Sequence, residues 1–156
     1  MKSVFLCENA DAVKNVYSDD TVSLLKKTAE IDKKVYSKND ILSLPDSFRN
    51  TEYIFSTWGM SQLSADEIKT FLPSLKCVFY AAGTVQYFAR PFLDCGVKVF
   101  SAWAANAVPV AEYTAAQIIL ANKGFFQTQQ KMSAGKVKEA KEFFFIIKAI
   151  TERKSE

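Results

Sequence analysis

Three short segments of the sequence carry residue types that could bind a small ligand, and each follows an apolar run. They are residues 81–85 (AAGTV), residues 101–106 (SAWAAN) and residues 56–60 (STWGM). In an open parallel sheet, ligands bind just beyond the carboxyl ends of the strands. If the three apolar runs are neighbouring parallel strands, these segments lie at one edge of the sheet. We therefore expect the ligand site there.

The segment around Gly83 is suited to binding an anion through its backbone. A glycine at this point lets the chain turn so that successive amide N–H groups point in one direction. The amides of Gly83, Thr84 and Val85 could then hold a carboxylate without a charged side chain. The same residues are also compatible with an ordinary turn from a strand to a helix.

Asn106 and Trp58 are the candidate side chains in the other two segments. Asn106 precedes a long apolar helix predicted over residues 109–122, and its amide group could contact an oxygen atom of a ligand. It could instead cap that helix, with Pro109 in the first turn. Trp58 could form a wall of a pocket, although a tryptophan at the end of a strand also serves in ordinary packing.

The composition argues against catalysis by this chain alone. It contains no histidine, which removes the commonest general acid or base and the commonest metal ligand. Cys7, Cys77 and Cys95 lie in apolar runs without metal-ligand spacing, so we expect buried, reduced thiols and no metal site. The glycines stand at positions 59, 83, 96, 124 and 135. That spacing cannot form G-x-G-x-x-G, the loop that holds a dinucleotide pyrophosphate.

The bulk properties are those of one globular protein. The chain has 156 residues, is 49% hydrophobic and has a net charge of +3 with interleaved acidic and basic residues, so we expect no nucleic-acid partner. No stretch approaches the ~20 apolar residues of a membrane span, so we expect no membrane partner either. The N-terminus is a poor signal peptide, and we expect a cytoplasmic protein.

Strand-like and helix-like segments alternate along the chain. The predicted strands are residues 2–7, 31–36, 53–56, 75–80 and 97–100. Capping residues open the helices between them: Asn9, Ser18, Ser37 or Asn39, and Ser64, which forms a capping box with Glu67. A further helix is predicted over residues 87–95, and Pro45 is expected to close a helical turn. The alternation predicts an α/β fold, with a doubly wound parallel sheet of five strands.

The middle of the sequence resembles the NAD-dependent D-isomer-specific 2-hydroxyacid dehydrogenases. Leu75-Lys76 before a strand, Gly83 in the following loop, and residues 96–99 (GVKV) match the family pattern. Residues 106–114 (NAVPVAEYT) match its last motif closely. The match covers roughly residues 50–125. Val85 departs from it, because the family has a second glycine there.

The resemblance implies a fold and a site. It implies a flavodoxin-like substrate-binding domain over residues 1–106 with strand order 2-1-3-4-5, a hinge helix over 107–130, and a helical or poorly ordered tail over 131–156. The substrate would be a small 2-hydroxy or 2-keto acid, held by the amides of Gly83, Thr84 and Val85, with Asn106 near the substrate and the nicotinamide. Trp58 completes our candidate substrate-binding residues.

The resemblance also implies what this chain lacks. The family's catalytic Arg, Glu and His lie in an NAD- or NADP-binding domain beyond the hinge, and none has a matching position here. We expect an inactive, truncated part of an oxidoreductase whose missing partner is that domain, and a frameshift near Phe145 is one hypothesis for the unfamiliar tail. Exposed apolar residues on the hinge helix would favour self-association. The alternative is a stand-alone flavodoxin-like module that binds a small ligand or a protein without catalysis.

Overall fold

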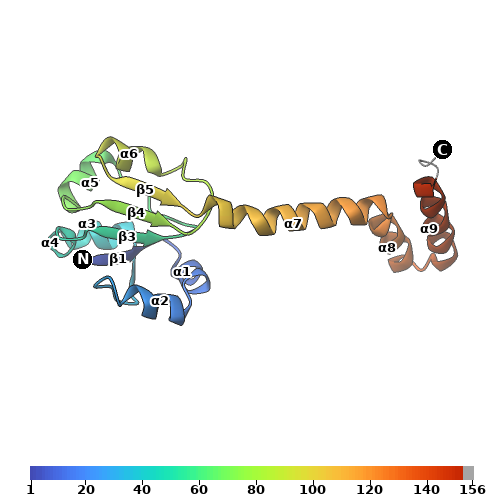
Figure 1. The fold of residues 1–156 in the computed structure, drawn as a ribbon, viewed down its shortest axis with the longest axis horizontal. Helices are drawn as coiled ribbons and strands as arrows, with labels where there is room; N and C mark the ends of the chain where they lie inside the picture. The colour runs from blue at the N-terminus through green and yellow to red at the C-terminus, as the bar shows by residue number, and fades with distance from the viewer. Residues whose placement is uncertain (153–156) are drawn as a thin grey trace. The chain divides into compact units, whose positions relative to one another are not determined.

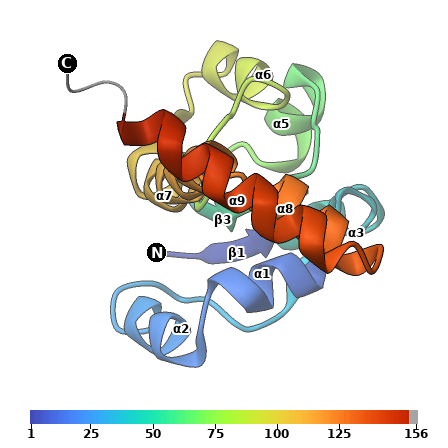
Figure 2. The ribbon, with the colours of Figure 1, turned by 90° about the vertical axis from the view of Figure 1, so that its right-hand side faces the viewer.

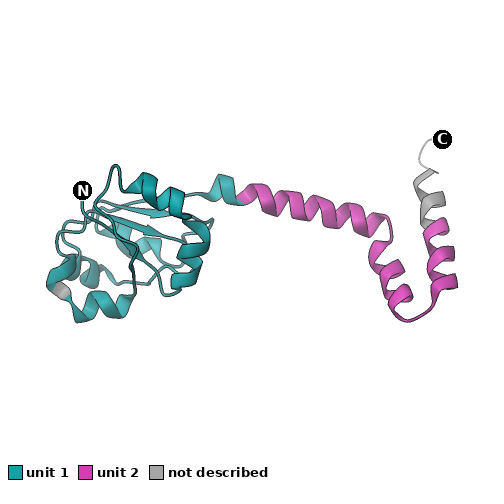
Figure 3. Cartoon of the chain, turned by 90° about the horizontal axis from the view of Figure 1, so that it is seen from below, with its two compact units in different colours: residues 1–106 teal, residues 107–156 magenta. Residues whose placement is uncertain are grey.

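The computed structural model describes the backbone of residues 1–152, together with their side chains apart from those of Pro45 and residues 147–152 (Figure 1). The chain divides into two compact units, residues 1–106 and 107–156 (Figure 3). The strands of the first unit are β1 (Ser3–Leu6), β2 (Val35–Tyr36), β3 (Tyr53–Ser56), β4 (Cys77–Tyr80) and β5 (Lys98–Ser101). Its helices are α1 (Ala10–Val16), α2 (Asp19–Leu25), α3 (Lys38–Ser43), α4 (Pro45–Phe48), α5 (Ala65–Phe71) and α6 (Ala89–Asp94).

The five strands form one parallel sheet in the order β2-β1-β3-β4-β5, as predicted. The prediction for β3 was correct to the residue. The strand predicted over residues 31–36 is an edge strand, but only Val35 and Tyr36 are in it. The residues before it turn instead: the Asp32 carboxylate accepts a hydrogen bond from the Lys34 amide at 2.9 Å, a local bond that competes with strand pairing.

Alternating side chains of the strands supply two separate hydrophobic clusters. Val4 and Leu6 of β1 and Ile54 of β3 point into the larger cluster, which is covered by α3, α4, α5 and α6. Phe5, between Val4 and Leu6, points to the other face and packs under α1 and α2. Figure 2 shows α1 and α2 on one side of β1 and β3, with α5 and α6 on the other. The sheet is therefore doubly wound, which confirms the predicted class.

Pro45 and Asn106 occupy different helix positions from those predicted from the sequence. Pro45 was expected to end a helical turn, but it opens α4 at a position where its missing N–H group costs no hydrogen bond. Asn106 was considered as a helix cap. It lies inside α7 (Trp103–Asn122), where its own N–H donates to the carbonyl of Ala102 at 2.9 Å. The alanines around it favour helix, which explains the early start.

The second unit is helical throughout the part that the structure describes. Here α7 continues to Asn122, Gly124 follows with a left-handed φ of 66°, and α8 (Phe125–Ser133) packs against α9 (Val137–Glu152). Residues 107–130, expected to be one hinge helix, are thus two helices. The tail is helical up to Glu152, and its last four residues lie outside the described part of the chain. The helices of residues 1–152 include none that is long and apolar enough to cross a bilayer.

Gly59 occupies a backbone conformation that a side chain would strain. Its φ is 94°, and a Cβ atom there would lie 3.3 Å from the Cys7 sulfur. We predict that Gly59→Ala lowers the free energy of unfolding by about 1–2 kcal/mol or more, measured by urea denaturation. Gly96→Ala is the matched control, because Gly96 also has a positive φ but open space around it. Equal losses in the two variants would show that the contact with Cys7 does not matter.

Glu67 links α3 and α5 through a pH-sensitive contact. Its carboxylate accepts hydrogen bonds from the Lys38 ammonium at 2.9 Å and the Ser64 amide at 2.7 Å, and these bonds lower the pKa of Glu67. Because the folded-state pKa lies below the unfolded one, the stabilisation is complete above the ordinary carboxyl pKa and is lost as the pH falls through the folded-state pKa.

We therefore predict that Glu67→Gln destabilises the fold by about 1 kcal/mol at pH 7 and much less at pH 3, in urea titrations at both pH values. Asp66→Asn, in the same helical turn, is the control for a general loss of negative charge at the start of α5. A pH-independent loss in Glu67→Gln would contradict the assignment.

Candidate functional site

The ends of three neighbouring strands lie at one edge of the sheet, as the sequence analysis expected. Ser56 of β3 is paired in register with Tyr80 of β4, and Tyr80 with Ser101 of β5. Two hydrogen bonds extend this pairing past the strand ends: Ala81 N–H to the Ser56 carbonyl at 2.9 Å, and Ala102 N–H to the Tyr80 carbonyl at 3.0 Å. The three candidate segments therefore start side by side.

The loop after β4 presents unused backbone donors. Among the hydrogen bonds of the described residues, none uses the amide N–H of Gly83, Thr84 or Val85 as a donor. Thr84 is exposed, whereas Val85 is half-buried against the larger hydrophobic cluster. The Val85 carbonyl accepts from the amides of Phe88 and Ala89, which begins the turn into α6. A valine at this position thus anchors the loop while leaving its amides available.

Asn106 lies directly against Gly83. A Cβ atom on Gly83 would come within 3.0 Å of the Asn106 side-chain nitrogen, closer than ordinary packing allows. The backbone φ of Gly83 is not positive, so its glycine leaves space for the Asn106 side chain and does not serve an unusual backbone conformation. The structure therefore places the Asn106 side chain against Gly83, the first of the three residues whose backbone amides the sequence indicated.

Trp58 belongs to a neighbouring turn whose hydrogen bonds run toward β1. The Met60 amide donates to the Thr57 carbonyl at 3.1 Å, with Gly59 at the third position of the turn, where type II turns favour glycine. The Trp58 carbonyl accepts from the Cys7 thiol at 3.2 Å, and the Gly59 carbonyl from the Glu8 amide at 2.8 Å. The Trp58 side chain is 54% exposed. Its place at the shared edge is clear, and its role as a pocket wall stays a prediction.

Ser101, the first residue of the candidate segment 101–106, makes contacts to the neighbouring loop that its sequence position did not predict. Its hydroxyl lies 2.6 Å from the Gly83 carbonyl and 3.0 Å from the Ala82 carbonyl, and donates to this pair. The bond fastens the end of β5 to the loop after β4. Thr57 makes a similar link, from its hydroxyl to the Ala81 carbonyl at 3.3 Å. A polar residue at the last position of a strand was the available signal for Ser101.

Two titratable groups near this edge, Cys7 and Tyr80, have raised pKa values. Burial raises the pKa of the Cys7 thiol, and burial together with the Tyr87 hydroxyl raises the pKa of Tyr80. Glu8 is committed to structure, because its carboxylate accepts from Ser61 at 2.5 Å and from the Lys38 amide at 3.0 Å. The described residues contain no cluster of three or more metal-ligating side chains. The arrangement can therefore bind and orient an anion, but it offers no evident group for proton transfer.

Comparisons with known proteins identify structures with this fold. No protein-family model matches the chain, and the search of curated proteins returned no match. Among solved structures, D-2-hydroxyisocaproate dehydrogenase matches with a TM-score of 0.60 at 13% identity, over 90% of this chain and 41% of that chain. NAD-dependent formate dehydrogenase from Staphylococcus aureus matches with a TM-score of 0.58 at 15% identity, over 91% of this chain and 45% of that chain. A phosphoglycerate oxidoreductase from Rhizobium etli matches with a TM-score of 0.58 at 18% identity, over 86% of this chain and 40% of that chain.

At these identities the likeness establishes the fold, and the chain spans less than half the length of each of these proteins. The resemblance predicted over roughly residues 50–125 is thus confirmed at the level of the fold, which this chain shares with part of D-2-hydroxyisocaproate dehydrogenase and of NAD-dependent formate dehydrogenase.

Proposed function

We propose that this chain is the substrate-binding part of an NAD- or NADP-dependent oxidoreductase that acts on a small D-2-hydroxy acid or 2-keto acid. The observation that carries the proposal is the meeting of three unused backbone amides, at Gly83, Thr84 and Val85, with the side chain of Asn106. Backbone amides at a strand end are suited to a carboxylate, and Asn106 adds a donor for a neighbouring oxygen. The shared fold with dehydrogenases supports the same conclusion.

Binding and orientation are the only steps that we assign to these residues. The amides would hold the substrate carboxylate, and the Asn106 amide would orient the adjacent hydroxyl or carbonyl group. Ser101 would act indirectly, by fixing the loop through its bonds to the Ala82 and Gly83 carbonyls. Trp58 would stand at the same edge of the sheet.

The residues of this chain do not fit a dinucleotide cofactor. Its five glycines cannot be aligned with G-x-G-x-x-G, and the chain contains no histidine. We therefore propose that cofactor binding, hydride transfer and proton transfer belong to further polypeptide that supplies the NAD-binding domain. This chain alone would bind the acid weakly and leave it unchanged.

The substrate proposal predicts a specific response to pyruvate. In 15N NMR titrations, pyruvate should shift the amide signals of residues 83–85 first, and methyl pyruvate, which lacks the carboxylate, should not. Asn106→Ala should weaken binding by about 1.5 kcal/mol, roughly ten-fold, because it removes a hydrogen bond to the ligand. Gly83→Ala should weaken it as well, because the added methyl group displaces Asn106. Asn122→Ala, in the same helix, is the matched control.

Unchanged signals at residues 83–85 in the presence of pyruvate would refute this site. If pyruvate fails but another ligand or a protein shifts the same edge, the stand-alone binding module becomes the better explanation. NADH should cause no saturable shift in either case. Tight NADH binding would contradict the proposal that cofactor binding belongs to further polypeptide.

We also propose that the chain self-associates through α7. The structure describes no buried residue in this helix, and four of its large aliphatic side chains are 56–60% exposed: Val108, Val110, Ile118 and Ile119. Large apolar side chains exposed along a helix favour association in water. Light scattering should give an average mass that rises with concentration above 17.5 kDa, and Ile118→Lys/Ile119→Lys should suppress the rise. A constant monomer mass at millimolar concentration would contradict the proposal.

A further inference from the structure

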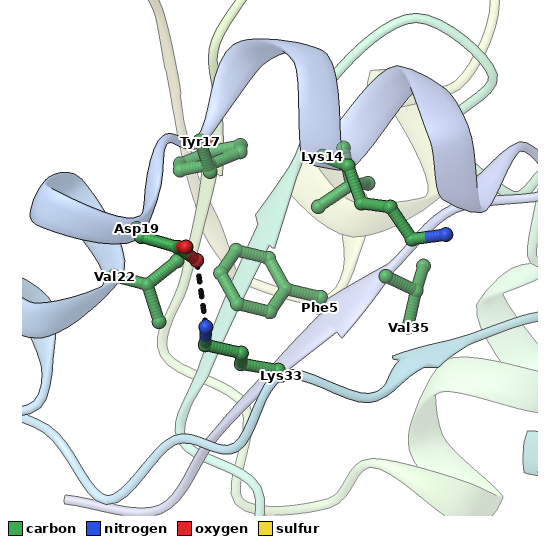
Figure 4. A pocket seen from close by; sticks show the side chains of 8 residues that line it. Phe5, Lys14, Tyr17, Asp19, Val22, Lys33 and Val35 are labelled. Carbon is green, nitrogen blue, oxygen red and sulfur yellow. Dashed lines mark hydrogen bonds and ion pairs between the residues drawn. The ribbon is translucent and has the colours of Figure 1, made fainter.

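A cavity large enough for a small molecule lies on the opposite half of the sheet from the Gly83 loop. It has a volume of about 340 Å3 and is enclosed by β1, β2, α1 and α2 with the loops that join them (Figure 4). The Gly83 loop follows β4, two strands away from β1 in the sheet order. Small-molecule sites typically measure about 300–1,000 Å3, so this cavity is large enough for a compact ligand.

The base of the cavity is apolar and rigidly held. Phe5 forms its centre and is 1% exposed, with Val13 and Val22 buried beside it. The Tyr17 ring meets the Phe5 ring edge to face, with 5.1 Å between the ring centroids. The Tyr17 hydroxyl already donates to the Ser56 carbonyl at 3.0 Å, so this residue offers a ligand its ring and not its hydroxyl. Such a surface selects the hydrocarbon body of a ligand.

The rim of the cavity is charged, and its two lysines form only solvent-exposed ion pairs. Lys33 pairs with Asp19 at 2.6 Å, and these side chains are 62% and 87% exposed. Lys14 pairs with Asp11 at 3.0 Å, outside the cavity lining, with side chains 71% and 84% exposed. Ion pairs this exposed exchange partners readily. The lining itself carries two ammonium groups against the single carboxylate of Asp19, so it favours a negatively charged head group.

We propose that this cavity binds a monocarboxylate with a branched aliphatic or aromatic body. The body lies over Phe5 between Val13, Val22 and Val35, and the carboxylate takes the ammonium groups of Lys14 and Lys33. Figure 4 shows the Lys33 ammonium beside Asp19 on one side of Phe5, and the Lys14 side chain on the other side, above Val35. The ligand must displace Asp19 from Lys33, so Asp19 is a competitor for the ligand carboxylate.

The test uses the full 156-residue chain and 3-phenylpropionate as the probe. In 13C methyl spectra, the signals of Val13, Val22 and Val35 should shift saturably, because an aromatic ring enters beside them. 3-Phenylpropanol has the same body without the charge and should bind at least about ten-fold more weakly. Pyruvate, which lacks the apolar body, should leave these methyl signals in place.

Variants of the rim separate a ligand site from a structural cavity. Lys14→Met/Lys33→Met keeps the aliphatic stems and should lose about ten-fold or more in affinity, whereas the exposed Lys27→Met should have no effect. Asp19→Asn should increase affinity several-fold, because it removes the competing carboxylate. A structural role for Asp19 would not produce such a gain.

Two results would overturn the inference. Absence of any saturable shift with 3-phenylpropionate would mean that the cavity is not a ligand site. Equal affinity for the alcohol, or an unaffected double lysine variant, would mean that it does not select carboxylates. Asn106→Ala should leave this binding unchanged, so the cavity and the Gly83 site can fail independently.

Discussion

The parallel, in-register pairing of β3, β4 and β5 is the constraint on which the candidate substrate site depends. Ser56, Tyr80 and Ser101 are the last residues of the three strands and stand side by side across the sheet. Because parallel strands run in one direction, the segments that follow them leave the sheet at the same edge. A shift of one strand by a single residue would turn its side chains to the other face and separate these segments.

Within that frame, two close contacts give the edge its chemical character. The Ser101 hydroxyl donates to the carbonyl oxygens of Ala82 and Gly83, and the described hydrogen bonds include none from the amide N–H groups of residues 83–85. The absence of a side chain on Gly83 lets Asn106 approach to a distance at which both can contact one small ligand. The result is a set of donors suited to an anion.

One face of the sheet is covered by helices over only part of its width. Phe5, Phe55, Phe79 and Phe100 form a row of rings across four adjacent strands, with neighbouring ring centroids 5.2–6.1 Å apart. Phe5 is 1% exposed under α1 and α2, whereas Phe100 at the far edge is 55% exposed. The same two helices that bury Phe5 also line the cavity over Phe5. One structural feature thus separates a closed, ligand-sized half of this face from an open half.

The sequence by itself determined the fold class, the order of the strands and the candidate residues at the sheet edge. These follow from local patterns: apolar runs of strand length, capping residues such as Ser64 with Glu67, and the motif over residues 106–114. Local patterns predicted less well where a contact distant in sequence decides the outcome.

Only the tertiary structure showed that Gly83 leaves space for Asn106 and does not form a left-handed turn, since 23 residues separate the two positions. Ser101 became significant only when pairing with β4 placed its hydroxyl beside the Gly83 loop. The cavity over Phe5 also depends on the packing of α1 and α2 against β1 and β2, and no local sequence pattern encodes a space between side chains.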